Sequence, residues 1–358
     1  MRRGIFDIAQ TVRGAATIGI SGHEKPDGDC VGSCLGLANY LRDLLPDARV
    51  DVFLERPPRE LVENIPGAET IRSDFVTDVP SYDVFIILDS AKERTKGAEA
   101  MFDAAKRKIN VDHHISNPGC GEINFVDPEA SSACELVYDL IRAAGGEEAA
   151  DPVTREIAQA LYVGMVTDTG VFRFSNTSKH TMEAAGDLLT YGFDHARIVR
   201  EVFFEKTYVQ QRMIARAVMG SSLHFGGRVV VSRINREDML EEGATRDDLE
   251  GAAAQLILTR GCVCSAFLQE QEENVYRVSL RSTGEADVSR IACSFGGGGH
   301  MRAAGCTLRC TGEEAEKPSW RRSKESFLRA RMRRRNSCLR DPLRREKDRP
   351  RHLLRQKT

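Results

Sequence analysis

The sequence predicts an α/β protein with a mostly parallel sheet in its first domain and a smaller α/β domain after it. Three observations lead to this prediction. Apolar runs alternate with helical patterns along the first half of the chain, several of these runs end in polar residues, and a β-rich block follows. Strands that alternate with helices are typical of parallel sheets covered on both faces. With 358 residues, the chain is long enough for two domains, each with its own core.

The alternating pattern defines the first domain, residues 1–193. Short buried strands are expected at 15–22, 48–54, 82–90 and 108–114. Helices are expected at 28–45, 97–107, 131–144, 151–166 and 178–191. Residues 194–215 are predicted to be a helical linker. In the second domain, 216–312, the pattern changes to strands, with Gly226-Gly227 as a hairpin turn, a helix at 287–294 and a strand at 305–309.

The composition is that of a soluble globular protein, with 41% hydrophobic and 29% charged residues. No apolar run approaches the ~20 residues that span a bilayer, and the first twenty residues lack the continuous apolar stretch of a signal peptide. The ten cysteines include no CxxC pair, so a disulfide framework is not expected. We therefore expect a cytoplasmic protein with reduced thiols and no membrane partner.

The net charge of −2 conceals an asymmetry along the chain. From Lys317 to Thr358 there are 17 Lys and Arg against four acidic residues, whereas residues 1–316 carry 34 basic and 49 acidic residues. An acidic body is poorly suited to binding long nucleic acids through counterion release. The basic tail, 313–358, has a composition typical of disordered segments. Two interpretations stay open: an arm that recruits RNA, or a reading-frame accident that replaces a terminal helix.

Polar residues stand at the ends of three predicted strands and beside two predicted helices. In open α/β sheets the ligand crevice lies beyond the carboxyl ends of the strands, where these residues fall. They are His23, Asp27, Asp29, Asp89, Asp112, His113, His114 and Asp168. Taken alone, each has an ordinary structural explanation, such as a helix cap for Asp29 or a turn for 111–114. Asp168 is harder to explain in this way, because an unpaired carboxylate in an apolar helix is costly.

If the side chains of this set converge, four carboxylates share one crevice and repel one another. Two divalent ions would cancel those charges. Mixed oxygen and imidazole ligands suit Mn²⁺, with Mg²⁺, Co²⁺ or Zn²⁺ as substitutes. Two such ions about 3.5–4 Å apart stabilise in-line phosphoryl displacement. The pattern therefore indicates phosphoester hydrolysis.

Four short segments, HEKPDGD, ILDS, VDHH and VTDTG, follow one another in the order that is found in the DHH phosphoesterase superfamily. The later FGGGGHMRAAG, 295–305, is similar to the glycine-rich signature of the DHHA1 domain. Together they resemble stand-alone nano-RNA hydrolases and pAp phosphatases, over about residues 1–310. This resemblance implies a DHH domain followed by a DHHA1 domain.

Carried over by position, the resemblance also implies roles for the site residues. His23, Asp27 and Asp89 would bind one metal ion, and Asp29, Asp89, His113 and Asp168 the other, so that Asp89 bridges them. His114 would face the scissile phosphate and Asp112 would orient the pair. In the second domain, the resemblance implies substrate binding by Arg281, Gly296, Gly297, Gly298, Gly299 and His300. Ser131 and Ser132 are either helix caps or substrate contacts, and Arg173 is either exposed or directed to the cleft.

The implied activity is hydrolysis of short single-stranded RNA and linear dinucleotides to mononucleotides, with removal of the 3′-phosphate of pAp as a second reaction. Duplex DNA is not an expected partner, and a homodimer stays open. A family II inorganic pyrophosphatase is the alternative enzyme, and a longer-strand exonuclease is less favoured because further domains are not seen. A regulator that binds nucleotides without turnover is the alternative outside the enzymes.

Overall fold

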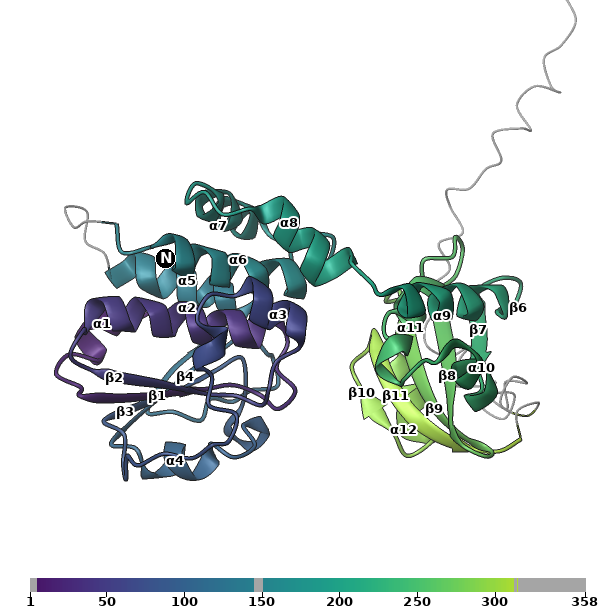
Figure 1. Ribbon diagram of the computed structural model, residues 1–358, viewed down its shortest axis with the longest axis horizontal. Helices are drawn as coiled ribbons and strands as arrows, with labels where there is room; N and C mark the ends of the chain where they lie inside the picture. Colours follow the sequence, from purple (N-terminus) through teal and green to yellow (C-terminus); the bar gives the residue numbers. More distant parts are fainter. Residues whose placement is uncertain (1–4, 145–150, 312–313, 315–358) are drawn as a thin grey trace, which may run out of the picture. The chain divides into compact units, whose positions relative to one another are not determined.

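The structure, a computed structural model, describes residues 5–144, 151–311 and Glu314. The chain divides into two compact units, Met1–Glu205 and Lys206–Thr358 (Figure 1). The division falls inside the segment 194–215 that the sequence predicts as a linker. Apart from Glu314, the predicted basic tail lies outside the described residues. Within the described parts of the chain, every helix is too short or too polar to span a bilayer.

The first unit is built on a sheet of five parallel strands in the order β2-β1-β3-β4-β5. These strands are β1 (Thr17–Ser21), β2 (Arg49–Phe53), β3 (Val84–Leu88), β4 (Arg107–Asp112) and β5 (Ile123–Val126). The predicted parallel sheet is confirmed. The sequence missed β5, an edge strand of four residues, INFV, of which only Phe125 is buried. So short a strand gives no apolar run to detect.

Helices cover both faces of this sheet (Figure 1). The helices of this unit are α1 (Ile8–Thr11), α2 (Gly28–Leu44), α3 (Arg59–Asn64), α4 (Glu99–Ala104), α5 (Ala133–Ala144), α6 (Arg155–Asp168), α7 (Lys179–Leu189) and α8 (His195–Val199). Of these, α7 and α8 pack on α6, on its side away from the sheet (Figure 1). In the central strand β3, Ile86 packs in the core beneath α2 and α6, whereas its neighbours Phe85 and Ile87 pack with Phe102 of α4. Because side chains alternate along a strand, a strand buried on both faces is apolar throughout. The continuous apolar run of β3 follows from this burial.

Helices α2 and α6 approach each other closely through glycines. A Cβ atom on Gly32 of α2 would lie 2.5 Å from the backbone oxygen of Ala160. A Cβ atom on Gly164 of α6 would lie 2.1 Å from the Cys134 sulfur and 3.0 Å from a carboxylate oxygen of Asp29. Only glycine allows this backbone approach. The approach brings the first turn of α2, with Asp29, next to α6, which ends at Asp168.

The second unit contains a mixed six-stranded sheet in the order β10-β11-β9-β8-β7-β6, in which only the β7–β8 pair is parallel. Its strands are β6 (Ser222–His224), β7 (Val229–Ile234), β8 (Cys264–Glu272), β9 (Val275–Ser282), β10 (Gly298–Gly299) and β11 (Ala303–Arg309). Its helices are α9 (Tyr208–Met219), α10 (Arg236–Glu242), α11 (Ala252–Leu256) and α12 (Val288–Ser294). The predicted hairpin is confirmed, with Gly226 and Gly227 in the turn between β6 and β7.

Both faces of this second sheet are buried. Val229 and Val231 of β7 pack on the α12 side, whereas Val230 packs with Met213 of α9 and Ala252 of α11. A smaller α/β domain is thus confirmed. The sequence missed α10 and α11 because helices of seven and five residues are too short to show a repeated apolar face.

The glycine contact between α2 and α6 can be tested by adding one methyl group. We expect Gly32→Ala to lower the free energy of unfolding by about 1–3 kcal/mol, because the backbone of α6 has to move. Gly186→Ala is the control, since Gly186 is also inside a helix but has nothing within 4 Å of an added Cβ. That change should stabilise the protein by about 0.5–1 kcal/mol. Urea unfolding of the metal-free protein measures both, and equal effects would contradict the packing argument.

Candidate metal centre

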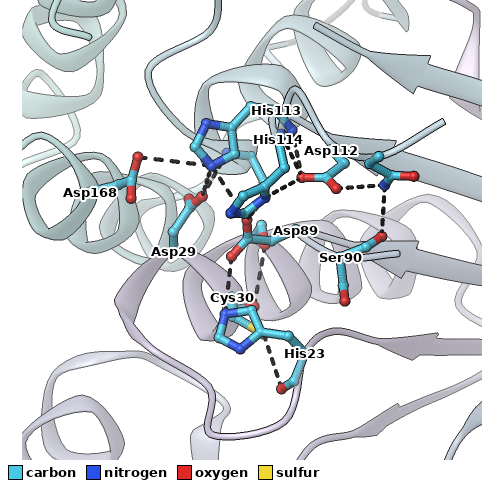
Figure 2. Close-up of polar contacts among 12 residues, drawn as sticks. His23, Asp29, Cys30, Asp89, Ser90, Asp112, His113, His114 and Asp168 are labelled. Carbon is cyan, nitrogen blue, oxygen red and sulfur yellow. Dashed lines mark hydrogen bonds and ion pairs between the residues drawn. The ribbon is translucent and has the colours of Figure 1, made fainter. Parts of the chain in front are cut away.

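Polar side chains from three strands and two helices meet at the carboxyl edge of the parallel sheet (Figure 2). His23 follows β1, Asp89 follows β3, Asp112 ends β4, and His113 and His114 come directly after it. The structure therefore brings together the residues that the sequence placed at the strand ends. Asp29, from the start of α2, and Asp168, from the end of α6, join them.

The two aspartates at the start of α2 make different contacts. Asp27 caps the helix by accepting hydrogen bonds from the backbone N–H groups of Asp29 and Cys30, both at 3.1 Å. Its Oδ1 also lies 3.7 Å from His23 Nε2, so that capping leaves it within reach of the centre. Asp29 is buried, and its carboxylate accepts hydrogen bonds from Ala133 N at 2.7 Å and Cys134 N at 2.9 Å. These donors begin α5, where the helix dipole favours a negative charge.

Asp89 occupies the middle of the centre. One carboxylate oxygen, Oδ2, lies 3.3 Å from His23 Nε2, and the other, Oδ1, lies 3.4 Å from both His113 Nε2 and His114 Nδ1. The side chain is buried, yet Oδ1 accepts no hydrogen bond within the described residues. Its backbone has a φ of +53°, a strained conformation that is typical of functional sites. A buried carboxylate oxygen without a donor is costly, so this position fits a cation.

His113 connects Asp89 with the second pair of carboxylates. Its Nε2 lies 3.7 Å from Asp29 Oδ2 and 3.8 Å from Asp168 Oδ2. Two groups of donors thus meet at Asp89, one containing His23 and the other containing His113. Imidazole nitrogens and carboxylate oxygens are the donors that Mn²⁺, Zn²⁺ and Co²⁺ accept, so the donor set fits a pair of divalent ions.

Asp112 orients the two histidines rather than pointing into the centre. Its Oδ1 accepts hydrogen bonds from His113 N at 2.7 Å and His114 N at 3.0 Å, and lies 2.7 Å from His114 Nδ1. Its Oδ2 accepts a hydrogen bond from Asn117 Nδ2 at 2.5 Å. Because Nδ1 of His114 is paired with this carboxylate, Nε2 is the nitrogen that remains for a ligand.

The crowded charges shift the pKa values of these groups. Burial, and then repulsion by Asp89, raises the pKa of Asp29 well above its ordinary value. Burial raises the pKa of Asp168 to about 6, although His113 opposes the shift. Burial alone would lower the pKa of His113, but its contacts with Asp89 and Asp29 raise it to about 10. Without a metal ion, protons on these groups offset the negative charge.

The same balance acts on the other two histidines. Burial would lower the pKa of His23, but its contacts with Asp27 and Asp89 raise it overall. The hydrogen bond to Asp112 raises the pKa of His114. Burial would raise the pKa of Asp112, yet the hydrogen bonds from His114 and Asn117 lower it, so that Asp112 stays ionised.

Sequence reasoning missed three residues at the centre. Cys30 has its sulfur within 4.8 Å of donor atoms of His23 and Asp89. Asn117 holds Asp112, and Asn176 donates a hydrogen bond to Asp168 Oδ2 at 3.2 Å. Cys30 could have been predicted to lie at the centre, because it directly follows Asp29 in the sequence. The two asparagines lie in loops, and nothing in their spacing indicates that they reach the centre.

The structure shows the contacts of the three residues for which the sequence left alternatives open. Ser132 accepts a hydrogen bond from Glu135 N at 3.1 Å and therefore acts as a helix cap, while the Ser131 hydroxyl contacts the Glu135 carboxylate. Arg173 is exposed, and its Nε donates to Gly170 O at 2.7 Å.

In the second unit, the residues implied in substrate binding lie at one edge of the sheet. Arg281 on β9 pairs with Ala303 on β11, which in turn is hydrogen-bonded to His300. An added Cβ would clash with β11 at Gly297 and Gly299, at 2.1 Å and 2.5 Å, but would have free space at Gly296 and Gly298. Strand packing thus explains two of the four glycines. Their role in substrate binding stays a prediction.

Comparison with known proteins now identifies the family. Residues 17–165 match the DHH family, N-terminal domain, and residues 226–318 match the DHHA1 domain. A bifunctional oligoribonuclease and PAP phosphatase NrnA from Thermus thermophilus is 35% identical over 86% of this chain and 88% of that protein. The chain belongs to the DHH family. The predicted membership, with a DHHA1 domain, is confirmed.

Two further relatives of this DHH-family chain cover most of its length. The NrnA of Bacillus subtilis, with the same described pair of activities, is 27% identical over 84% of this chain and 92% of that protein. A solved structure, an exopolyphosphatase-related protein from Bacteroides fragilis, superposes with a TM-score of 0.79 at 27% identity. It covers 88% of this chain and 96% of that one.

Removing the Asp89 carboxylate should weaken metal binding on both sides of the centre, since it lies between the two donor groups. We expect Asp89→Ala, and also Asp89→Asn, to lower bound Mn²⁺ from about two ions per chain to about one or none. Elemental analysis after dialysis measures this. Asp103→Asn is the control, because Asp103 is exposed, pairs with Lys92 and belongs to none of the donor groups of the centre. Unchanged metal content in both Asp89 variants would contradict the bridging position.

The metal centre should also show a defined pH dependence. In the metal-free protein, the raised pKa values of Asp168, about 6, and His113, about 10, stabilise the fold at low pH. This stabilisation is lost as the pH rises, first through Asp168 and then through His113. Protons also compete less with metal at higher pH. The rise in Tm caused by Mn²⁺ should therefore be larger at pH 8 than at pH 6.

Differential scanning calorimetry at the two pH values measures this difference. Asp89→Ala should show little effect of Mn²⁺ at either pH. A rise in Tm that is equal or smaller at pH 8 would contradict the proton competition.

Proposed function

We propose that this protein hydrolyses short RNA oligonucleotides and linear dinucleotides such as pApA and pGpG to mononucleotides. We also propose that it removes the 3′-phosphate from pAp. The observation that carries the proposal is the Asp89 carboxylate, which lies between the imidazoles of His23 and His113 with one oxygen unpaired. The relatives named as oligoribonucleases and PAP phosphatases support this choice of substrate.

The proposed ligands form two groups that share Asp89. His23 and Asp27 would complete one site, and Asp29, His113 and Asp168 the other. When bound, a pair of Mn²⁺ ions, or Mg²⁺ or Co²⁺ in their place, supplies Lewis acidity and an activated hydroxide for in-line displacement. Cys30 places a sulfur near His23, but burial raises the pKa of its thiol, so the carboxylates and imidazoles are the proposed ligands.

The chain's own residues contribute orientation and proton transfer. Asp112 holds His114 by Nδ1 and raises its pKa, so that the other ring nitrogen carries a proton toward the scissile phosphate. His114 thus serves as the donor to the phosphate or to the leaving oxygen. In the second unit, Arg281, His300 and the open backbone at Gly296 and Gly298 are proposed to bind a substrate phosphate, because backbone N–H groups and cations are the usual phosphate donors.

The alternative functions have less support. A family II inorganic pyrophosphatase is not favoured, because residues 226–318 match the DHHA1 domain. A regulator without turnover would have no need for a strained Asp89 at the centre of a complete donor set. A cytoplasmic location is consistent with the free thiols of the described cysteines.

The proposal predicts release of AMP from pApA in the presence of Mn²⁺ and none after chelation with EDTA. His114→Ala should lower kcat by about 10²–10⁴-fold, the usual contribution of a general acid, while bound Mn²⁺ is retained. His224→Ala is the control, since this histidine lies on β6 of the second unit and contacts Ser222.

Steady-state assays with pApA and pAp side by side, together with metal analysis, provide the measurement. Failure of the unaltered protein to hydrolyse either compound with Mn²⁺ would refute the proposal. Full activity of His114→Ala would refute the role of His114.

A further inference from the structure

The last residue of a loop beside the metal centre is hydrogen-bonded to Asp168, the residue that comes directly before the loop. Residues 169–176 start directly after Asp168, and Asn176 Nδ2 then donates hydrogen bonds back to Asp168 O and Asp168 Oδ2, both at 3.2 Å. The same nitrogen donates to Ser131 O at 2.9 Å. The loop is thereby attached at both ends to Asp168, a proposed metal ligand.

The backbone of this loop is strained. Gly170, Val171 and Phe172 follow one another with φ of +56°, +59° and +59°. For a β-branched residue such as Val171 this region is a true outlier. Hydrogen bonds from Val171 N to Val166 O at 2.8 Å and from Phe172 N to the Thr169 hydroxyl at 2.9 Å maintain the turn. Strain that the surroundings maintain in this way is found at functional sites.

The strained turn presents the ring of Phe174. This ring packs on Gly170, where an added Cβ would lie 2.4 Å from it, and the Phe174 N–H donates to Thr169 O at 3.0 Å. Even so, half of the side chain, 50%, is exposed. The ring is therefore fixed from the protein side and open on the other.

The guanidinium group of Arg173 is a second neighbour of the Phe174 ring. Its guanidinium carbon lies 6.0 Å from the centroid of the Phe174 ring and 5.4 Å from that of Phe203, and its Nε donates to Gly170 O. Single exposed aromatic side chains are common on protein surfaces and need no explanation. Phe174 differs from such residues, because Gly170 and Arg173 contact its ring and hydrogen bonds attach its strained loop to Asp168.

We propose that the exposed face of Phe174 stacks on a nucleobase of the substrate. The proposal rests on the nucleotide hydrolysis proposed above, and it adds the residue that binds the base. Stacking on an aromatic ring tolerates every base, because each has a π face. The protein should therefore bind dinucleotides of different sequence with similar affinity.

Equilibrium binding tests this, with a phosphorothioate-linked diadenylate that resists hydrolysis as the probe and Mn²⁺ present. Two further probes lack one base each, at the first or the second nucleotide. We expect Phe174→Ala to raise the Kd for the complete probe by about 5- to 150-fold, the usual effect of losing one stacked base. Phe174→Trp should bind as the unaltered protein does. Phe225→Ala, which removes a ring of similar exposure in the second unit, should have no effect.

The abasic probes complete a double-mutant cycle. For one of them, Phe174→Ala should change nothing further, because the base that stacks is already missing. Equal Kd values for Phe174→Ala and the unaltered protein with the complete probe would overturn the proposal, as would an equal loss with all three probes. If the unaltered protein binds the probe but does not hydrolyse pApA, the proposed activity fails while stacking stands. If it does not bind the probe, both fail.

Discussion

Repulsion among buried carboxylates is the constraint on which the rest of the first unit depends. Asp29, Asp89 and Asp112 are all nearly inaccessible to solvent, and Asp168 lies beside them. The fold supplies a partner for almost every one: the start of α5 donates to Asp29, Asn117 to Asp112, and Asn176 to Asp168. Asp89 Oδ1 is left without a hydrogen bond. A cation is the remaining way to compensate it, whether imidazolium in the metal-free protein or a metal ion.

The position of the carboxylates depends in turn on how closely the helices pack. Asp29 and Asp168 come from different helices, and they share His113 only because α2 and α6 approach at backbone distance. Gly32 and Gly164 are therefore part of the centre although neither carries a donor atom. Moving either helix outward would change the distance between Asp29 and Asp168, so stability and metal binding are coupled here.

The glycine run of the second unit and the loop after Asp168 show how one residue type serves two purposes. At Gly297 and Gly299 the neighbouring strand leaves no space for a side chain, whereas at Gly296 and Gly298 the backbone is open to solvent. At Gly170, likewise, the Phe174 ring occupies the space that a side chain would need. In both segments, glycine lets another group approach the backbone. Packing explains part of each segment, and the open part is left for the nucleotide contacts proposed above.

Much of the first unit was predictable from the sequence, because its signals are local. The buried strands β1 and β3 are short apolar runs, and the polar residues that follow them mark the edge of the sheet at which a ligand binds. His23, Asp89 and His113 could be grouped on that basis, and Asp168 was recognised because it lies in an apolar helix. Elements without a periodic signal were missed: β5 has one buried residue, and α10 and α11 are shorter than two helical turns.

The tertiary structure alone decided how the donors are shared and supported. Asn117 and Asn176 reach their carboxylates across loops, and Ser132 turned out to cap a helix. The strained turn at 170–172 and the exposed Phe174 ring have no signature in the residue pattern, since an apolar run after a helix reads as buried. The physical reason is the same in each case. The residue types and their order determine which charges must be compensated, but the long-range packing determines which atom compensates them.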